Sequence, residues 1–310
     1  MKKELFISAG IIFFVLIVII VIIAFSNNQN LENYNLEEKN KFEINKSFYK
    51  TKHLLVPTNL TNKYIGKNIS KEDVLVSFRI DDITFSIQQK QVLANALLLA
   101  RKYNITFDLA VTAETFHNFS EKSTFKTFDD NQDVFEIVAH GYNNKNNLNL
   151  SNKKSEFKGV SLDIQDKHIR EMKNIFEMHN LSNHGSNIFI LPWNSGDENT
   201  ILLSIKHNYK IIAMKFNFNE SNKNINNSIL LINSMVGIKM VENLTNQDIA
   251  STKNALINEI KNNSKNIHII MHPINFNNIS SAESLIKDII QIQNNYPQIK
   301  FGMISERMEL

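Results

Sequence analysis

The stretch that decides the fold is residues 74–82, VLVSFRIDD, a short apolar run that ends in two adjacent carboxylates, Asp81 and Asp82. Short runs rich in β-branched and aromatic residues are typical of buried strands, so we predict a strand over residues 74–80. The same pattern recurs along the rest of the chain, each time after a longer, more polar stretch. We predict further strands at residues 105–111, 134–139, 187–191, 209–214, 228–232, 267–271 and 300–304.

Amphipathic stretches between these runs predict helices. The predicted helices cover residues 88–103, 164–178, 199–207, 247–262 and 282–294. Strands that alternate with helices over about 240 residues indicate an α/β fold, either a (β/α) barrel or an open parallel sheet, built as a single domain. The sequence has no glycine-rich phosphate loop and no GxSxG motif, which removes the usual support for a nucleotide-binding protein or a serine hydrolase.

Polar residues directly follow the first and third predicted strands. The C-terminal ends of parallel strands meet on one side of a sheet, so such residues are candidates for an active site. One of Asp81 and Asp82 can bind a metal while the other stays ionised as a general base. His140, followed by Gly141, suits Zn²⁺, and Asn144 offers a weaker oxygen ligand. The structural alternatives are a helix N-cap for the aspartates and a hydrogen-bonding role for the histidine.

Two further predicted strands are each followed by a segment that contains proline. The first segment is Pro192, Trp193 and Asn194, and its tryptophan, the only one in the chain, can provide a flat wall for a sugar ring. The second is His272 with a proline after it, and this histidine can donate a proton. The structural alternatives are a tryptophan that fills the core and a histidine that caps a strand.

In this order along the chain, the Asp-Asp, His-Gly, Pro-Trp and His-Pro pairs resemble the polysaccharide deacetylase family, also called the NodB homology domain or carbohydrate esterase family 4. The resemblance runs from about residue 74 to the C-terminus, and it implies a distorted (β/α) barrel. It further implies that Asp81 is the catalytic base, that His272 is the general acid, and that Asp82 and His140 bind a metal.

The resemblance also implies a substrate-binding wall and a cofactor. Pro192, Trp193 and Asn194 fall on the motif that forms the wall of the substrate groove, and we expect them to bind substrate together with Arg79, which is also a candidate partner for the catalytic base. Asn144 stands where the second metal-binding histidine of the family is expected, so it is the predicted third ligand. The implied cofactor is one divalent metal ion, with Zn²⁺ first and Co²⁺, Ni²⁺ or Mn²⁺ as alternatives.

The activity that the resemblance implies is the hydrolysis of N-linked or O-linked acetyl groups on a polysaccharide or glycan outside the cytoplasm. An alternative of a different class is a catalytically degenerate deacetylase scaffold that binds glycans at the cell surface. The asparagine at the third ligand position supports this alternative, because an amide oxygen is a poorer partner for Zn²⁺ than an imidazole. A third alternative is a structural α/β domain in which Asp81, Asp82 and His140 only cap and hydrogen-bond.

The N-terminus contains a long apolar run, residues 5–25. A helix of this length at about 1.5 Å per residue spans about 31 Å, enough to cross a bilayer. The run is longer than the apolar part of a signal peptide, which favours an uncleaved anchor over a cleaved leader. Residues 1–4, with two lysines, are then expected in the cytoplasm, followed outside the cell membrane by a polar linker, residues 26–70, and the catalytic domain, residues 71–310.

The charge and cysteine content exclude several classes of protein. The net charge is +3 without a basic block, so we expect no nucleic-acid partner. The chain has no cysteine, which rules out disulfide bonds and thiolate metal sites. No sequence pattern predicts an oligomeric state.

Overall fold

The computed structural model describes residues 69–118, 122–143, 155–179, 187–215 and 229–307, which all belong to one compact unit, Asn59–Leu310. The predicted cytoplasmic segment, the predicted anchor and nearly all of the predicted linker lie outside the described residues. In the ranges that are described, no helix combines the length and the apolar character that a membrane span requires.

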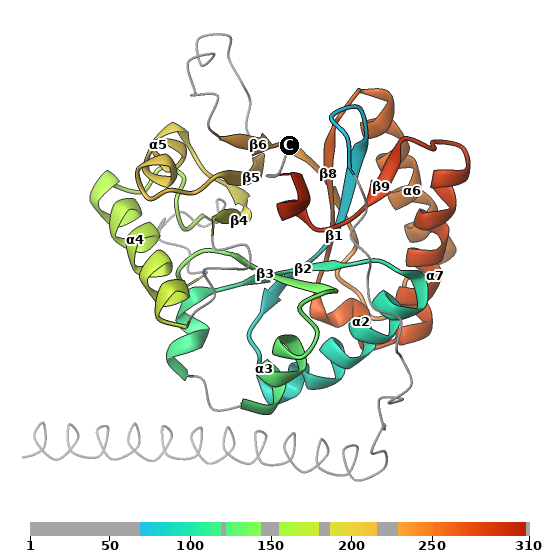
Figure 1. The fold of residues 1–310 in the computed structure, drawn as a ribbon, viewed down its shortest axis with the longest axis horizontal. Coiled ribbons are helices and arrows are strands. Elements are labelled where there is room, and N and C mark those ends of the chain that lie inside the picture. The colour runs from blue at the N-terminus through green and yellow to red at the C-terminus, as the bar shows by residue number, and fades with distance from the viewer. Residues whose placement is uncertain (1–68, 119–121, 144–154, 180–186, 216–228, 308–310) are drawn as a thin grey trace, which may run out of the picture. The chain divides into compact units, whose positions relative to one another are not determined.

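The described residues form nine strands, all paired in parallel, in a single sheet at the centre of the unit (Figure 1). The strands are β1 Val74–Ile83, β2 Phe107–Val111, β3 Phe135–Ala139, β4 Ile188–Ser195, β5 Ile211–Lys215, β6 Leu230–Ile232, β7 Ser234–Gly237, β8 Asn266–Met271 and β9 Ile299–Phe301. Their order is β6-β5-β4-β3-β2-β1-β8-β7, and β9 also pairs with β1.

The sheet is curled into a nearly closed barrel. Strands β6 and β7 stand at opposite ends of the strand order, yet only Asn233 separates them in the chain. The two edges of the sheet must therefore come together, which closes the sheet on itself. This confirms the predicted (β/α) barrel over the open parallel sheet.

Helices surround the barrel on its outer side (Figure 1). The helices are α2 Lys90–Tyr103, α3 Lys122–Asp129, α4 Leu162–Met178, α5 Glu198–Lys206, α6 Asn246–Lys261 and α7 Ile279–Ile290, with short 3₁₀ turns η1 Ile87–Gln89, η2 Ala113–Asn118, η5 Pro273–Phe276, η6 Gln291–Asn294 and η7 Ile304–Arg307. Side chains cap several helix starts: Asp197 accepts the backbone N–H of Thr200, and Thr245 accepts that of Asp248. All five predicted helices are present, and α3 is an additional short, polar helix.

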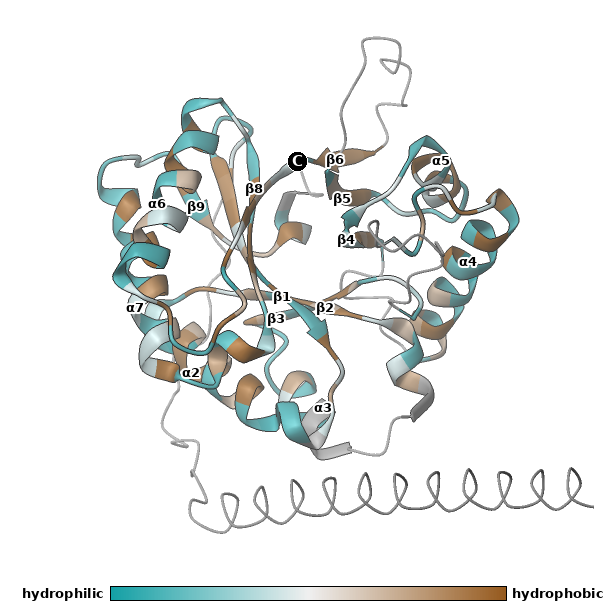
Figure 2. Ribbon diagram, turned by 180° about the vertical axis from the view of Figure 1, so that it is seen from behind, coloured by the Kyte–Doolittle hydropathy of each residue, from teal (hydrophilic) through white to brown (hydrophobic). Residues whose placement is uncertain are grey.

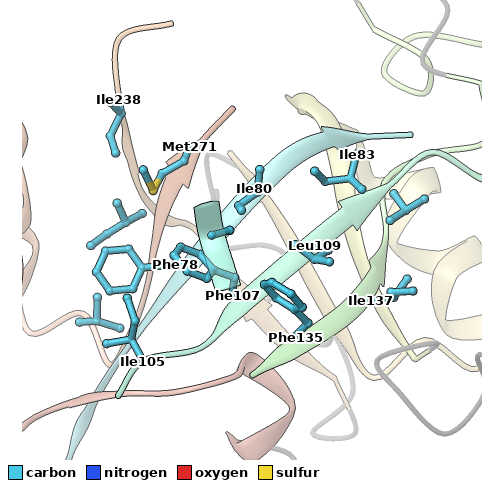
Figure 3. Packing of buried hydrophobic residues seen from close by; sticks show 14 of the residues in the cluster. Phe78, Ile80, Ile83, Ile105, Phe107, Leu109, Phe135, Ile137, Ile238 and Met271 are labelled. Carbon is cyan, nitrogen blue, oxygen red and sulfur yellow. The ribbon is translucent and has the colours of Figure 1, made fainter. Parts of the chain in front are cut away.

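The main hydrophobic core lies between the barrel and the helices. Figure 3 shows apolar side chains of neighbouring strands packed together, among them Phe78, Phe107 and Phe135. The Phe78 ring is stacked on Phe301 at a centroid distance of 5.7 Å, and Phe107 is edge-on to Phe276 at 5.6 Å. Figure 2 shows strands that are largely hydrophobic and helices on which hydrophobic and hydrophilic residues alternate. Because successive side chains of a strand point to opposite faces, the remaining strand residues point into the barrel.

The chain differs from the prediction at the last strand. The predicted strand over residues 300–304 ends at Phe301, and the chain then turns into η7. Gly302 gives the Glu306 side chain room to lie against the turn, since a Cβ at this position would lie 2.0 Å from Oε2 of Glu306. Strand β7 was not predicted either, because one residue between β6 and β7 gives no turn signal in the sequence.

Candidate active site

A buried ion pair forms near the C-terminal end of β1. Nε of Arg79 lies 2.6 Å from Oδ1 of Asp81, and Nη2 lies 2.6 Å from Oδ2. The two side chains are only 0% and 7% exposed. Burial tends to raise the pKa of Asp81, but the positive charge of Arg79, with smaller contributions from His140 and His272, holds this pKa below its ordinary value. Asp81 is therefore ionised at neutral pH and can accept a proton.

The end of β4 supports this pair from the opposite side of the site. Oδ1 of Asn194 accepts a hydrogen bond of 3.0 Å from Nη2 of Arg79. Strand pairing shifts between Ile190 and Ser195, and both Trp193 and Asn194 have left-handed backbones, with φ of 51° and 52°. Such conformations cost about 1–3 kcal/mol each and cluster at functional sites. Here they accompany an Asn194 side chain directed at Arg79 and an exposed Trp193.

The residues predicted to bind substrate therefore differ in exposure. Trp193 is 39% exposed and accessible to a ligand. Pro192 is buried against Gly141, and Arg79 is buried and bonded to Asp81 and Asn194. From these contacts we interpret Arg79 as a residue that positions Asp81, the second of its two predicted roles.

His140 directly follows β3, and the protein fixes one edge of its ring. Nδ1 lies 3.1 Å from the carbonyl oxygen of Ile190. A carbonyl oxygen can only accept, so Nδ1 carries the proton of the neutral ring and Nε2 keeps its lone pair. Nε2 lies 3.7 Å from Oδ1 of Asp82. Gly141 then turns the chain with φ of 80°, where a Cβ would lie 2.4 Å from Cγ of Pro192.

These contacts fit part of a metal site. A ring whose Nδ1 donates to a carbonyl group and whose Nε2 is bare is the usual arrangement of a metal-binding histidine. The adjacent carboxylate of Asp82 is a second suitable donor. The predicted third ligand, Asn144, lies outside the described residues. Among the residues that the structure covers, no group of three or more His, Cys, Asp or Glu side chains could hold a metal ion.

His272 follows β8 and lies near the two aspartates. Burial lowers the pKa of His272, and the negative charges of Asp81 and Asp82 oppose this shift only in part. Its Nδ1 is buried and makes no hydrogen bond to any described residue. His272 is therefore mainly neutral at pH 7, at a position where it can exchange a proton with a ligand.

Asn275 is a site residue that the sequence did not reveal. Its Oδ1 accepts the backbone N–H of His272 at 2.9 Å, and its Nδ2 donates to the carbonyl oxygens of Lys239 and Val241. This buried amide ties the loop after β8 to the loop after β7, and it fixes the backbone of His272. An asparagine two residues after a His-Pro pair gives no signal by itself in an asparagine-rich chain.

No protein family and no curated protein matches the sequence, but solved structures match the fold. A protein from Mycobacterium smegmatis assigned as a polysaccharide deacetylase matches with a TM-score of 0.55 and 11% identity, over 80% of this chain and 93% of its own. A CE4 family pseudoenzyme from Bacillus anthracis has a TM-score of 0.49 and 13% identity, over 76% of this chain and 66% of its own, just under two thirds. A family 4 carbohydrate esterase from Streptomyces lividans has a TM-score of 0.46 and 10% identity, over 76% and 94%.

The likeness to the Mycobacterium smegmatis structure extends over nearly the whole length of that protein. The strand ends that carry Asp81, Asp82, His140 and His272 lie near one another in this barrel. The described unit has the fold of the polysaccharide deacetylases of carbohydrate esterase family 4.

Proposed function

We propose that the protein is a hydrolase that removes N-linked or O-linked acetyl groups from a polysaccharide or glycan. The observation that carries this proposal is the pair of unlike titratable groups at the barrel mouth. The positive charge of Arg79 keeps the Asp81 carboxylate ionised, whereas burial lowers the pKa of His272 and keeps most of its rings uncharged at pH 7. Titratable groups whose environments push their pKa values apart are characteristic of an acid and base that work together.

In the proposed reaction, Asp81 accepts the proton of a water molecule that attacks the acetyl carbonyl carbon. Arg79 and Asn194 keep the Asp81 carboxylate fixed, so that little reorganisation is needed when the proton arrives. His272, in its protonated form, gives a proton to the departing amine or alcohol of the sugar. Acetate and a deacetylated sugar are the products.

The proposal includes one divalent metal ion, bound by Asp82 and His140 with Asn144 as the expected third ligand. Zn²⁺ suits the imidazole best, and Co²⁺, Ni²⁺ or Mn²⁺ are the alternatives. Such an ion supplies Lewis acidity: it polarises the acetyl carbonyl and lowers the pKa of a bound water. The bare Nε2 of His140, 3.7 Å from the Asp82 carboxylate, supports this part of the proposal.

We further propose that the domain acts outside the cytoplasm, held at the cell membrane by residues 5–25. The length of this apolar run supports the proposal.

A second candidate function is glycan binding on a degenerate scaffold. Among the described residues, Asp82 and His140 are the two suitable metal donors that lie together, and no third His, Cys, Asp or Glu completes a metal site with them. Trp193 is exposed enough to stack on a sugar even without a metal. In this case the protein would bind glycans through Trp193 without hydrolysing them.

Metal content and acetate release together distinguish the two functions. We would incubate the purified full-length protein with each of the four metal ions, remove the excess, and measure bound metal by elemental analysis. About one ion per chain is expected, lost in His140→Ala but kept in the matched control His207→Ala, whose ring lies at the end of α5 beside Asp166. The metal-loaded protein would then be assayed on acetylated glycans.

Asp81→Asn is the decisive variant in the activity assay. It should abolish acetate release and leave the metal content unchanged, because Asp81 is bonded to Arg79 rather than placed as a ligand. Full activity in Asp81→Asn would refute the role of the base. A wild-type protein that binds no metal, yet binds glycans through Trp193, would establish the second function instead.

A further inference from the structure

The chain leaves β1 through a bulge that contains Asp82. In register, Ile80 pairs with Leu109 and Ile83 pairs with Val111, so β1 has one more residue than β2 between these pairs. An extra residue of this kind changes the direction in which nearby side chains point. Ile80 and Ile83 both pack in the core between the barrel and the helices, as Figure 3 shows. In a regular strand Asp82 would point to the same side as Ile80, into that core.

The backbone of Asp82 is left-handed, with φ of 58°. This conformation is unfavourable for a residue with a side chain, and it persists only where the surroundings enforce it. In an unbroken strand Asp81 and Asp82 would face opposite sides of the sheet. The left-handed turn instead brings Oδ1 of Asp82 to 3.7 Å from Nε2 of His140. The geometry of this turn therefore decides whether the carboxylate faces the histidine.

The side-chain amide of Gln89 closes the turn. Its Nε2 donates to the carbonyl oxygen of Asp82 at 2.9 Å, and its Oε1 accepts the N–H of Thr84 at 2.7 Å. A carbonyl oxygen can only accept and a backbone N–H can only donate, so these partners fix the orientation of the amide. One side chain thus binds the backbone groups on both sides of Ile83 and holds the peptide that follows Asp82.

Gln89 comes from a part of the structure that is itself well supported. It is the last residue of η1 and directly precedes α2, whose residues Val92 and Leu93 are buried in the main core. Its own N–H donates to the carbonyl oxygen of Ser86 at 3.0 Å. A side chain based at the start of a packed helix gives the turn a fixed reference point.

Phe85 anchors the same loop independently of Gln89. This side chain is 2% exposed, and its ring centroid lies 6.0 Å from that of Phe116 and 6.2 Å from that of Phe128. A variant that lacks the Gln89 amide is therefore expected to keep a folded loop after β1. What it loses is the control of the peptide between Asp82 and Ile83.

Packing alone does not fix the carboxylate of Asp82. Its side chain is 41% exposed, whereas that of Asp81 is 7% exposed and bonded to Arg79. The direction of the Asp82 side chain thus depends mainly on its backbone. In metal sites, removing a residue that orients a ligand typically lowers the metal affinity or the activity about 10- to 100-fold.

We propose that Gln89 positions Asp82 for metal binding, by holding the left-handed turn in which the Asp82 carboxylate faces His140. The inference rests on the metal site of the proposed function and on no other part of it. Gln89 itself contacts neither metal nor substrate. Without its amide, the peptide after Asp82 can rotate toward an ordinary backbone conformation, the carboxylate turns away from Nε2 of His140, and metal binding weakens.

The Zn²⁺ affinity of the full-length protein, measured by competition with a chromophoric chelator, tests the proposal. Gln89→Met removes both hydrogen bonds but keeps an unbranched side chain of similar length, and it should weaken Zn²⁺ binding about tenfold or more. Gln89→Ala should weaken it to a similar extent, which excludes an effect of the methionine itself. The matched control is Gln293→Met, which removes a 2.7 Å bond to the carbonyl oxygen of Ile299, at the start of β9. This control should keep the wild-type affinity.

Urea unfolding of the metal-free proteins and hydrogen exchange separate positioning from stability. Gln89→Met and Gln293→Met should lower the unfolding midpoint by similar small amounts, and only Gln89→Met should speed the exchange of the Thr84 amide. Wild-type affinity in Gln89→Met, or an equal loss of affinity in Gln293→Met, would overturn the proposal.

The same measurements distinguish a failure of this inference from a failure of the proposed function. A wild type that binds Zn²⁺ but releases no acetate would refute the hydrolase alone, because the affinity of Gln89→Met is measured without substrate. A wild type that binds no Zn²⁺ would refute the metal site and the role of Gln89 together.

Discussion

Replacing Arg79 with methionine leaves the Asp81 carboxylate in the barrel without its cation. Methionine retains much of the apolar volume of arginine, so the principal losses are the charge, two hydrogen bonds to Asp81 and one to Asn194. Removing one partner of a buried ion pair costs about 3–5 kcal/mol, since the other charge stays buried and uncompensated. We expect the free energy of unfolding at pH 7 to fall by about this amount.

The pH dependence of the Arg79→Met variant should be opposite to that of the wild-type pair. In the wild type, the pKa of Asp81 is below its ordinary value, so the pair stabilises the fold above about pH 4 and this contribution is lost on acidification. Without Arg79, burial becomes the dominant influence and raises the pKa of Asp81. The variant should therefore lose less stability relative to wild type at pH 4 than at pH 7.

The assay is urea unfolding of the full-length protein with a chelator present, at several pH values. Asp81→Asn in the Arg79→Met background should recover about 2 kcal/mol, because it removes the uncompensated charge. Arg170→Met is the matched control: its contact with Asp166 is 3.5 Å long and Arg170 is 54% exposed, so a change below about 1 kcal/mol is expected. A loss in Arg79→Met no larger than in this control would refute the reasoning.

Two further predictions concern the turn after β3 and the proposed general acid. Gly141→Ala places a Cβ 2.4 Å from Cγ of Pro192 on a backbone with φ of 80°, so it should cost about 2–4 kcal/mol in urea unfolding. Gly237→Ala meets nothing within 4 Å and should change stability by less than about 1 kcal/mol; equal losses in the two variants would contradict the packing argument. Burial, opposed by nearby carboxylates such as Asp81, lowers the pKa of His272 below 6.5, so kcat for acetate release should decline as pH rises through this lowered value. The decline should disappear in His272→Gln, and its persistence would assign the titration to another group.

Local sequence patterns were sufficient for most of the barrel. The run at residues 74–80 and the later apolar runs predicted eight of the nine strands in the described residues, because a buried parallel strand needs a short apolar sequence of its own. The same runs located the polar residues at the strand ends, among them Asp81, His140 and His272. Strand β7 and helix α3 escaped prediction, since β7 depends on its pairing with β8 and α3 is short and polar.

The sequence by itself thus determined the strand and helix order and the chemical types of residue at the barrel mouth, because both depend on short-range periodicity and composition. Only the tertiary structure decided which groups meet. It set the bonds from Arg79 to Asp81 and Asn194, the contact of His140 Nδ1 with the carbonyl oxygen of Ile190, and the bonds that the backbone of η7 donates to Asp108 and Glu136. These contacts join residues that are far apart in the chain, and their burial and pKa shifts arise only when the closed barrel removes water from them.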